Sequence, residues 1–446
     1  MNPVKKTLWL LLLALPPLFA TLYSGATGVV DGQMSPWTPV MLDLDVYQRT
    51  GHLVLEGKPF YVTKDWLPFI YPPFAALLAV PLAFVGQIPA QVIWLVLNAF
   101  MMMALIHRLG FKGWYWSAIS TAAIWFVEPV RTTLGFGQVN LFICGMVALD
   151  LIPGPRLFRK RLLPQGWLIG IATAIKLTPA LFAVYLFLSG RIKPALVAFG
   201  SFCVVTLIGF IALPSQSVLF WTRLVGGDSG MNATLKYFTN QSVFGVWVRF
   251  AEVDTSHSVP KGAYLVAAVV ALLGLAGAVL WQRLGRSSLA FGVCAITALL
   301  VNPISWSHHW VWVVPFALLL IRDTKIPGLI RGYGIVYSVW ICFAPFNEFG
   351  DGRDEFTYTF VTKLIDAGNA IFGIGFLVLT LAIALTERRR LGLPPLPLTL
   401  RAHEKGGPAL ESDAESTHDG ELEGGPDVVG GETPAGGSTA VAAPKA

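Results

Sequence analysis

Long apolar stretches recur along this chain, and a few polar and titratable groups interrupt them. A helix needs about 20 mostly apolar residues to cross the hydrocarbon core of a bilayer. Stretches near that length follow one another from the N-terminus to about residue 385. The composition agrees, because 54% of the 446 residues are hydrophobic, only 13% are charged, and the mean hydropathy is +0.63. The sequence therefore predicts an all-α, polytopic integral membrane protein.

The polar interruptions gather in a few places. Asp43-Leu44-Asp45 follows the first apolar stretch, and Ser305-Trp306-Ser307-His308-His309 separates two late ones. A charged or titratable side chain at membrane depth is costly, so such residues persist mainly where they line a wet cavity or take part in chemistry. We therefore expect an active site at one face of the membrane.

The distribution of charge argues against a nucleic-acid partner. The net charge is +6, but residues 404–446 carry nine acidic residues and two lysines, and the rest of the chain has 30 Lys and Arg against 17 Asp and Glu. In a membrane protein such a surplus indicates orientation by basic loops and contact with anionic lipid head groups. The four cysteines lie singly in apolar stretches, without the spacing of a zinc site or a disulfide framework, and are expected to be packing residues.

Nucleotide-binding motifs are also missing from the sequence. It contains no G-x-x-x-x-G-K-[ST] loop and no G-x-G-x-x-G that follows a strand, so a soluble nucleotide domain is not expected. The energy for any reaction must then arrive with an activated substrate.

The N-terminus predicts an uncleaved first span. Residues 1–6, followed by apolar residues 7–20, resemble a signal peptide, but Pro16-Pro17 and the lack of a small-residue cleavage site favour a retained helix. Lys5 and Lys6 would then lie in the cytoplasm.

Basic clusters set the remaining topology. If all of them are cytoplasmic, an even number of crossings separates each neighbouring pair. This rule makes the Pro-initiated segment 72–86 interfacial or re-entrant, and it requires a break at Lys176-Leu177-Thr178-Pro179. Twelve spans and two cytoplasmic termini then fit the chain, with the unusual polar groups on the outer side. The spans are 7–24, 89–107, 114–130, 135–152, 165–176, 178–188, 195–213, 263–282, 287–303, 309–321, 330–346 and 361–385.

This topology divides the chain into a membrane domain and a tail. The membrane domain covers residues 1–392, with an external catalytic loop at 25–70. Residues 393–446 are acidic and rich in Gly, Pro and Ala, which predicts a disordered cytoplasmic tail.

An ordered series of short motifs resembles glycosyltransferase family 87, whose members are integral-membrane GT-C enzymes that use polyprenyl-phosphate mannose. The resemblance covers about residues 7–385. Its motifs are Asp43-Leu-Asp45-Val-Tyr47, Gly57-Lys-Pro59-Phe-Tyr61, Tyr71-Pro-Pro-Phe74, Gly137-Gln-Val-Asn140, Ile175-Lys-Leu-Thr-Pro179, Asn240-Gln-Ser242 and Ser305-Trp-Ser-His-His309.

The resemblance implies a GT-C fold and an inverting transfer of mannose from a β-linked polyprenyl phosphate donor. The acceptor it implies is a phosphatidylinositol mannoside, the product carries an α-1,2 linkage, and the site lies on the periplasmic face of the plasma membrane. Alternatives are another actinobacterial mannosyltransferase of lipomannan or lipoarabinomannan, and an ion-coupled secondary transporter, since broken helices with polar tips also describe carriers. A lipid phosphatase that uses the two histidines is a third reading.

In such an enzyme an acidic residue of the first external loop is the general base, and Asp45 is the expected residue. A base must approach the acceptor hydroxyl on the side opposite the leaving phosphate. Asp45 also has capping-box spacing to Gln48, so it could instead cap a helix. Asp43 is the rival, with a further expected role in binding sugar. The Asp43-x-Asp45 pair matches a metal-binding spacing, but no essential metal or other cofactor is expected.

Cationic and amide side chains complete the expected site. His309 is expected to bind donor phosphate or acceptor hydroxyl or to be a proton partner of Asp45, with His308 in support, although a regular helix would turn the two rings about 100° apart. Lys176 is expected to neutralise the leaving phosphate, with Arg131 and Arg353 as further candidates. Alternatively, the histidines could lie in an aromatic belt at the membrane interface, and Lys176 could extend its ammonium group to that interface without a catalytic role.

Four amides are candidates for sugar or acceptor binding. Each could equally satisfy the backbone at a broken helix end. They are Gln138, Asn140, Asn240 and Gln241.

Overall fold

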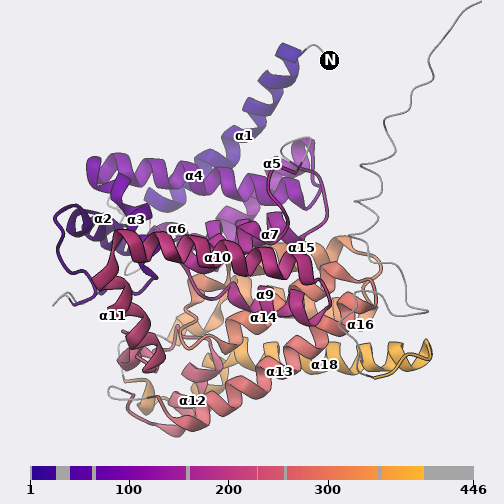
Figure 1. The fold of residues 1–446 in the computed structure, drawn as a ribbon. Coiled ribbons are helices and arrows are strands. Elements are labelled where there is room, and N and C mark those ends of the chain that lie inside the picture. The colour runs from indigo at the N-terminus through magenta and orange to yellow at the C-terminus, as the bar shows by residue number, and fades with distance from the viewer. Residues whose placement is uncertain are drawn as a thin grey trace, which may run out of the picture.

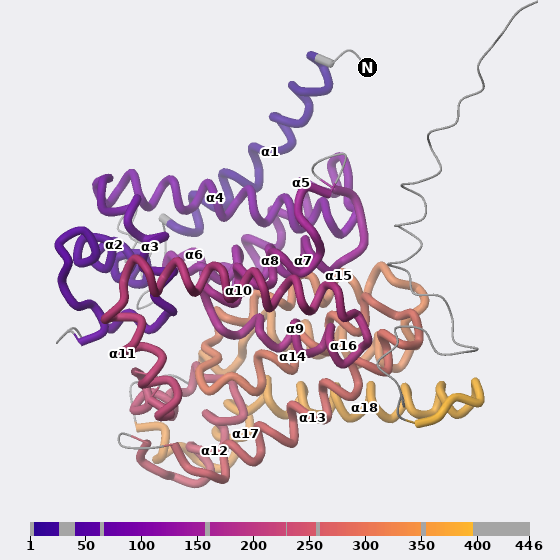
Figure 2. The backbone as a smooth tube through the Cα atoms, viewed as in Figure 1, coloured from indigo at the N-terminus to yellow at the C-terminus, as the bar shows by residue number. Residues whose placement is uncertain are grey.

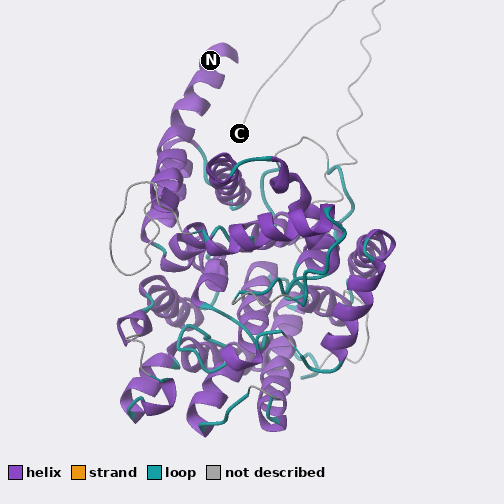
Figure 3. Ribbon diagram, turned by 90° about the vertical axis from the view of Figure 1, so that its left-hand side faces the viewer, coloured by secondary structure: helices purple, strands orange, loops and turns teal. Residues whose placement is uncertain are grey.

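The described part of the chain is helical. The computed structural model describes residues 3–26, 41–62, 67–156, 161–228, 230–255, 259–349 and 354–395. Within these ranges there is no β-strand, and a single isolated bridge joins Asn240 and Trp306. Helices and connecting loops account for the whole described chain in Figure 3. The all-α class predicted from the sequence is confirmed. The predicted tail lies, from residue 396 onward, outside the described residues.

Six helical stretches within the described residues are long and apolar enough to cross a membrane. At about 1.5 Å per residue, a helix of their length matches a hydrocarbon core of about 30 Å. Their length and apolar composition agree with the membrane protein that the sequence predicts. The helices are α1 (Pro3–Ala26), α4 (Gln87–Arg108), α10 (Ile192–Ala212), α13 (Lys261–Arg283), α16 (Gly328–Phe343, continued by η4, Pro345–Phe349) and α18 (Gly368–Arg390).

Most of the other predicted spans are shorter helices. A helix of nine residues rises only about 14 Å, so it reaches about halfway through a bilayer. The predicted span 114–130 is divided at Val127, whose extended backbone separates two helices. The shorter helices are α5 (Gly113–Phe126), α6 (Glu128–Phe136), α7 (Asn140–Leu151), α8 (Trp167–Ile175), α9 (Ala180–Leu188), α14 (Ser287–Val301) and α15 (Val313–Arg322).

The predicted break at Lys176 is present. Helix α8 ends at Ile175, Lys176 has extended backbone angles, and α9 begins at Ala180 after Pro179. Asn302, directly after α14, donates a hydrogen bond to the Thr178 hydroxyl (3.0 Å) in the same break. The break is therefore anchored to a second interruption far along the chain.

Short helices cluster at one end of the long ones. In Figure 1, α2 (Leu42–Leu55), α3 (Pro73–Ala79, followed by η1, Val80–Phe84), α11 (Pro214–Val225) and α12 (Val243–Ala251) lie at the left-hand end of α4, α10 and α13. Helix α17 (Phe360–Asp366) packs against α12 at the same end, as Figure 2 shows. The segment 72–86, predicted to be interfacial, forms α3 and η1.

Basic residues mark the opposite end of the long helices. Arg108 lies in the last turn of α4, Arg283 in that of α13, and Arg388–Arg390 in that of α18. Each of these ends points away from α2, α3, α11 and α12 (Figure 1). The charge asymmetry used to derive the topology is therefore an asymmetry of the folded molecule.

Candidate active site

Asp43 lies on α2 and lines a large cavity. The cavity has a volume of about 1890 Å³ and is bounded by residues of α2, α6, α11, η3 (Ser307–Trp312) and the loops between them. Asp43 is the second residue of α2, in its first turn, where a carboxylate complements the helix dipole. Its partly buried side chain borders the cavity.

Asp45, the expected general base, points elsewhere. It is exposed and is not among the described residues that line the cavity. Residues two positions apart on an α-helix are about 200° apart around its axis, so Asp43 and Asp45 cannot share one face. The alternative reading, in which Asp45 caps a helix, is wrong, because α2 begins at Leu42 and its N-cap is Met41. The two carboxylates thus do not converge as a metal-binding pair would.

Gln138 holds Asp43 from the wall formed by α6 and α7. Its Oε1 atom accepts hydrogen bonds from the hydroxyls of Tyr47 and Tyr71 (both 3.1 Å) and from the backbone N–H of Val139 (3.2 Å). Because these donors occupy the carbonyl side of the amide, its NH₂ group is left to hydrogen-bond the Asp43 carboxyl. Gln138 is expected to bind sugar hydroxyls, but these protein contacts already occupy part of its hydrogen-bonding capacity.

Gly137 makes this arrangement possible. It ends α6 in the left-handed region (φ 68°), which glycine adopts without strain. A Cβ atom there would lie 2.6 Å from the Cβ of Leu44, so the close approach of α2 to the end of α6 also requires a glycine.

Burial and two polar neighbours set the protonation of Asp43. Burial raises its pKa to about 6, while the hydrogen bond from Gln138 and the positive charge of Lys176 act in the opposite direction. A carboxyl group with a pKa near 6 is mostly ionised at neutral pH and is still basic enough to accept a proton, as a general base must.

Lys176 occupies the break between α8 and α9 and points into the cavity. Its Nζ atom donates to Oδ1 of Asn140 (2.9 Å) and lies 3.0 Å from Nε2 of His309. It also lies 5.3 Å from the centroid of the Tyr71 ring, a cation–π distance. When Lys176 is protonated, its ammonium group has three hydrogens and no acceptor, so Nε2 of His309 is the acceptor of this contact and one ammonium hydrogen is left for a ligand.

The two histidines both border the cavity because their backbone is not a regular α-helix. They lie in the 3₁₀ segment η3, where Trp310 departs from helical angles. Their ring centroids are 4.7 Å apart with the planes perpendicular, and His308 also meets Phe136 of α6 edge to face. The expected obstacle, two rings turned apart on a regular helix, is therefore absent.

Asn140 supports the site from behind. Besides accepting from Lys176, it donates to the backbone oxygen of His308 (2.9 Å), which also accepts from the Thr133 hydroxyl (2.7 Å). It does not belong to the described cavity lining. Its place is thus between the lysine and the histidine segment rather than on a sugar.

Asn240 and Gln241 are structural in this fold. The Asn240 side chain donates to the backbone oxygens of Leu235 and Pro303 and accepts from the backbone N–H of Ser305, so both ends of its amide are used. Both residues are fully buried and neither is among the described lining residues. These contacts favour the alternative reading, in which the two amides satisfy the backbone at a broken helix end, over the binding of sugar hydroxyls.

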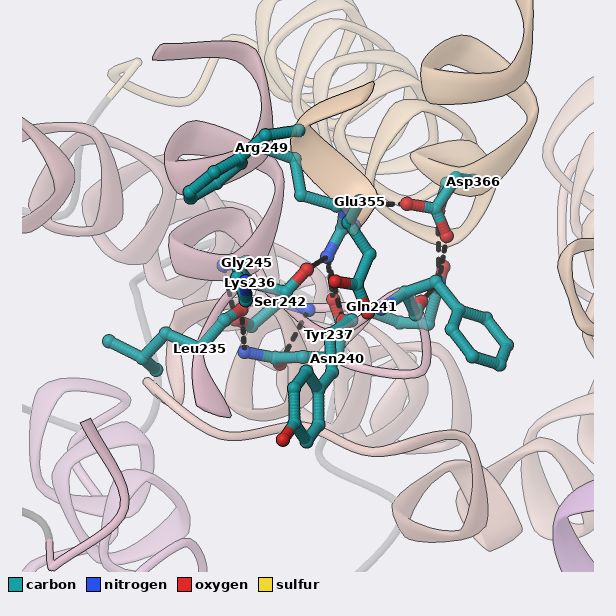
Figure 4. Close-up of polar contacts among 12 residues, drawn as sticks. Leu235, Lys236, Tyr237, Asn240, Gln241, Ser242, Gly245, Arg249, Glu355 and Asp366 are labelled. Atoms are coloured by element: carbon teal, nitrogen blue, oxygen red, sulfur yellow. Dashed lines mark hydrogen bonds and ion pairs between the residues drawn. The ribbon is translucent and has the colours of Figure 1, made fainter. Parts of the chain in front are cut away.

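An ion pair that sequence reasoning missed lies beneath this loop. Arg249 of α12 and Asp366 of α17 are both buried, with Nε and Oδ2 2.5 Å apart. Nη1 of Arg249 also donates to the backbone oxygens of Tyr237 (2.9 Å) and Asn240 (3.0 Å), as Figure 4 shows. Arg249 is the one charged residue of α12, and an arginine inside an apolar stretch was the only signal of the pair in the sequence.

The two arginines expected to bind the donor phosphate differ in what the structure shows of them. Arg131 lines the cavity and is exposed, whereas Arg353 lies outside the described residues. Tyr47 and Tyr71 belong to the recognised motifs but had no assigned role. Among the residues that the structure describes, no group of three or more His, Cys, Asp or Glu could hold a metal ion.

Comparison with known proteins gives a consistent result. The model of Glycosyltransferase family 87 matches residues 69–303. The chain is 31% identical over 435 residues to the polyprenol-phosphate-mannose-dependent alpha-(1-2)-phosphatidylinositol mannoside mannosyltransferase of Mycobacterium tuberculosis, which covers 88% of this chain and 96% of that protein. The enzyme of the same name from Mycolicibacterium smegmatis is 31% identical over 345 residues, covering 68% of this chain and 76% of that protein.

A relative whose name gives a different acceptor is also similar. It is the polyprenol-phosphate-mannose-dependent alpha-(1-2)-phosphatidylinositol pentamannoside mannosyltransferase of Mycobacterium tuberculosis (strain CDC 1551 / Oshkosh), 32% identical over 290 residues, covering 61% of this chain and 63% of that protein. No solved structure matches the chain.

The buried ion pair predicts a large difference between two carboxylates. Asp366→Ala leaves the Arg249 charge buried without its partner, so we expect a loss of about 3–5 kcal/mol in unfolding free energy. Asp354→Ala removes the more exposed pair with Lys236 (3.1 Å) and one cap bond from the backbone N–H of Phe356, and it should cost much less. Thermal unfolding in detergent measures both, and equal losses would contradict the structural role of Asp366.

Proposed function

Because the chain belongs to glycosyltransferase family 87, we propose that it transfers mannose from polyprenyl-phosphate mannose to a phosphatidylinositol mannoside and forms an α-1,2 linkage. The names of relatives that align with most of the chain support both substrates. The acceptor proposed is the tetramannoside and the product the pentamannoside. The observation that carries the proposal is the meeting of Asp43, Lys176 and His309 at one cavity.

Asp43, rather than Asp45, is proposed as the general base. It borders the cavity, its pKa is raised to about 6, and the Gln138 amide fixes its carboxyl group. In the proposed step, Asp43 takes the proton of the acceptor hydroxyl while that oxygen attacks the anomeric carbon. The bond from this carbon to the phosphate oxygen breaks on the opposite side, so a β-linked donor gives an α-linked product.

Lys176 is proposed to stabilise the leaving group. As the glycosidic bond breaks, negative charge grows on polyprenyl phosphate, and an ammonium group held beforehand by Asn140 and His309 meets it without reorganisation. The neutral His309 then acts mainly by aiming Lys176. Arg131 also lines the cavity, but Glu128 and Glu348 line it too and make Arg131 a weaker candidate than Lys176 for binding phosphate.

We place the reaction on the periplasmic face of the plasma membrane. The basic ends of α4, α13 and α18 would lie in the cytoplasm, and α2, α3 and α11 at the outer surface. The finer arrangement, with twelve crossings and both termini cytoplasmic, remains part of this proposal. It requires several short helices, such as α8 and α9, to cross in pairs or with adjoining segments.

The function is tested with the purified full-length chain in nanodiscs. We expect transfer of labelled mannose from polyprenyl-phosphate mannose to a phosphatidylinositol tetramannoside, and none from GDP-mannose alone. Because Lys176 supplies the cation that a metal would otherwise provide, transfer should persist in EDTA. Transfer only to a longer lipomannan acceptor would instead support the alternative within the family, and exchange of a solute without transfer would support a carrier.

The two aspartates provide a matched pair of variants. Asp43→Asn should lower kcat by about 10²–10⁴-fold, the usual contribution of a positioned base, while binding of the donor is retained. Asp45→Asn, on the exposed face of α2, should keep most of its activity. Initial rates for the two purified variants decide between them, and a greater loss for Asp45→Asn would restore Asp45 as the base.

The raised pKa of Asp43 predicts the acidic limb of the pH profile. A general base works only when it is deprotonated, so kcat/KM should rise with pH and level off above about 6. Below this value the logarithm of kcat/KM should fall by one for each pH unit. A profile that stays flat down to pH 4.5 would show that Asp43 does not titrate in the free enzyme as proposed.

A further inference from the structure

A third cationic side chain, Arg223 of α11, borders the cavity and has no role in the proposed reaction. Gln216 and Arg223 are seven residues apart on α11 and therefore share one face of the helix. Oε1 of Gln216 accepts from the backbone N–H of Phe60 (3.3 Å), and Nη1 of Arg223 donates to the backbone oxygen of Tyr61 (3.0 Å). These two bonds fasten α11 along the segment after α2.

Much of the Arg223 guanidinium is left for a ligand. Its side chain is 37% exposed, and its ion-pair partner among the described residues, the carboxylate of Asp228, lies 3.9 Å from Nε, beyond hydrogen-bond distance. A guanidinium group has five N–H donors in a rigid fork that matches the oxygens of a phosphate. The bond to Tyr61 fixes this fork in place without neutralising its charge.

Another part of the cavity wall is less suited to an anion. There Arg131 is accompanied by two carboxylates, Glu128 and Glu348. Oε1 of Glu128 accepts from the Thr132 hydroxyl (2.7 Å) and the Asn347 amide (3.2 Å). Two acids against one arginine favour neutral hydroxyl groups over phosphate, whereas the wall at Arg223 has one arginine and one acid.

Arg223 also lies where the cavity meets an apolar outer surface. Phe220 and Leu224 flank it on the cavity side. On the outer surface, Ile211 near the end of α10 is 73% exposed and Val225 at the end of α11 is 88% exposed. A basic side chain beside an amphipathic helix at a membrane surface is a common arrangement for binding a lipid head group.

We propose that Arg223 binds the phosphodiester of the lipid acceptor, which leaves Lys176 for the phosphate of the donor. This inference rests on the proposed function, in which each of the two lipid substrates carries one phosphodiester. The donor phosphate must lie at the reacting carbon, near Asp43 and Lys176. The acceptor phosphate is separated from the attacking hydroxyl by the sugar chain, so it needs a second cation at a distance, next to the lipid surface. The mannose chain would run from Arg223 to Asp43.

The test compares two acceptors in Arg223→Gln. With phosphatidylinositol tetramannoside we expect the acceptor KM to rise about tenfold or more, the loss of one charge-assisted contact, while the donor KM is unchanged. With an alkyl tetramannoside that lacks phosphate, wild type and variant should have the same kcat/KM. Arg223→Lys should recover part of the lost affinity because it keeps the charge but not the fork. Arg390→Gln, at the far end of α18, is the matched control and should behave as wild type.

Other outcomes overturn the inference. A rise in the donor KM would assign Arg223 to polyprenyl phosphate. If Arg223→Gln lowers kcat/KM equally with both acceptors, Arg223 has only a structural role in fastening α11. The same conclusion follows if Arg223→Gln is unstable and Arg223→Lys fully restores activity with both acceptors.

A binding measurement separates this inference from the proposed function. Native mass spectrometry can compare binding of phosphatidylinositol mannoside and of a mannosyl diacylglycerol without turnover. Arg223→Gln should weaken the first and not the second, even if wild type fails to transfer mannose. Equal binding of the phospholipid by wild type and variant would refute the role of Arg223 whatever the enzyme's activity.

Discussion

The contact of the Lys176 ammonium with Asn140 and His309 is the interaction on which the site depends. It joins the break between α8 and α9, the start of α7 and the segment η3, which are far apart in the chain. A lysine at membrane depth is tolerated only where partners and a wet cavity compensate for its lost hydration. Here both partners are neutral, so the positive charge is directed without being cancelled and remains available to an anion.

The sequence predicts the places where the membrane helices break better than it predicts the directions of individual side chains. The break at Lys176 follows from a short apolar stretch interrupted by Pro179, and it is present. Asp45 was expected to be the base from the family resemblance, and the alternative reading, in which Asp45 caps a helix, placed the start of α2 too late. On a helix, an error of two residues moves a side chain to the opposite face. The boundary depends on tertiary contacts with Gly137, which local spacing does not reveal.

Residues that act through long-range contacts were harder to predict. Asn240 looks like a sugar-binding residue in sequence, and only the folded chain shows that Pro303 and Ser305 already use its amide. Arg249 and Asp366 have no periodicity or motif to reveal them, since each pairs with a residue on another helix. The walls of the cavity likewise differ in charge only once α6, η4 and α11 are brought together.

The bonds of Asn240 also bear on how substrates enter and leave. Four hydrogen bonds join residues 240–242 to residues 303–305, and the second of these segments leads directly into the two histidines. Neither segment can move without breaking these hydrogen bonds or moving the other segment with it. If the cavity widens for lipid exchange, these two segments must therefore move together as one rigid unit. Otherwise the widening must take place entirely on the side of α11.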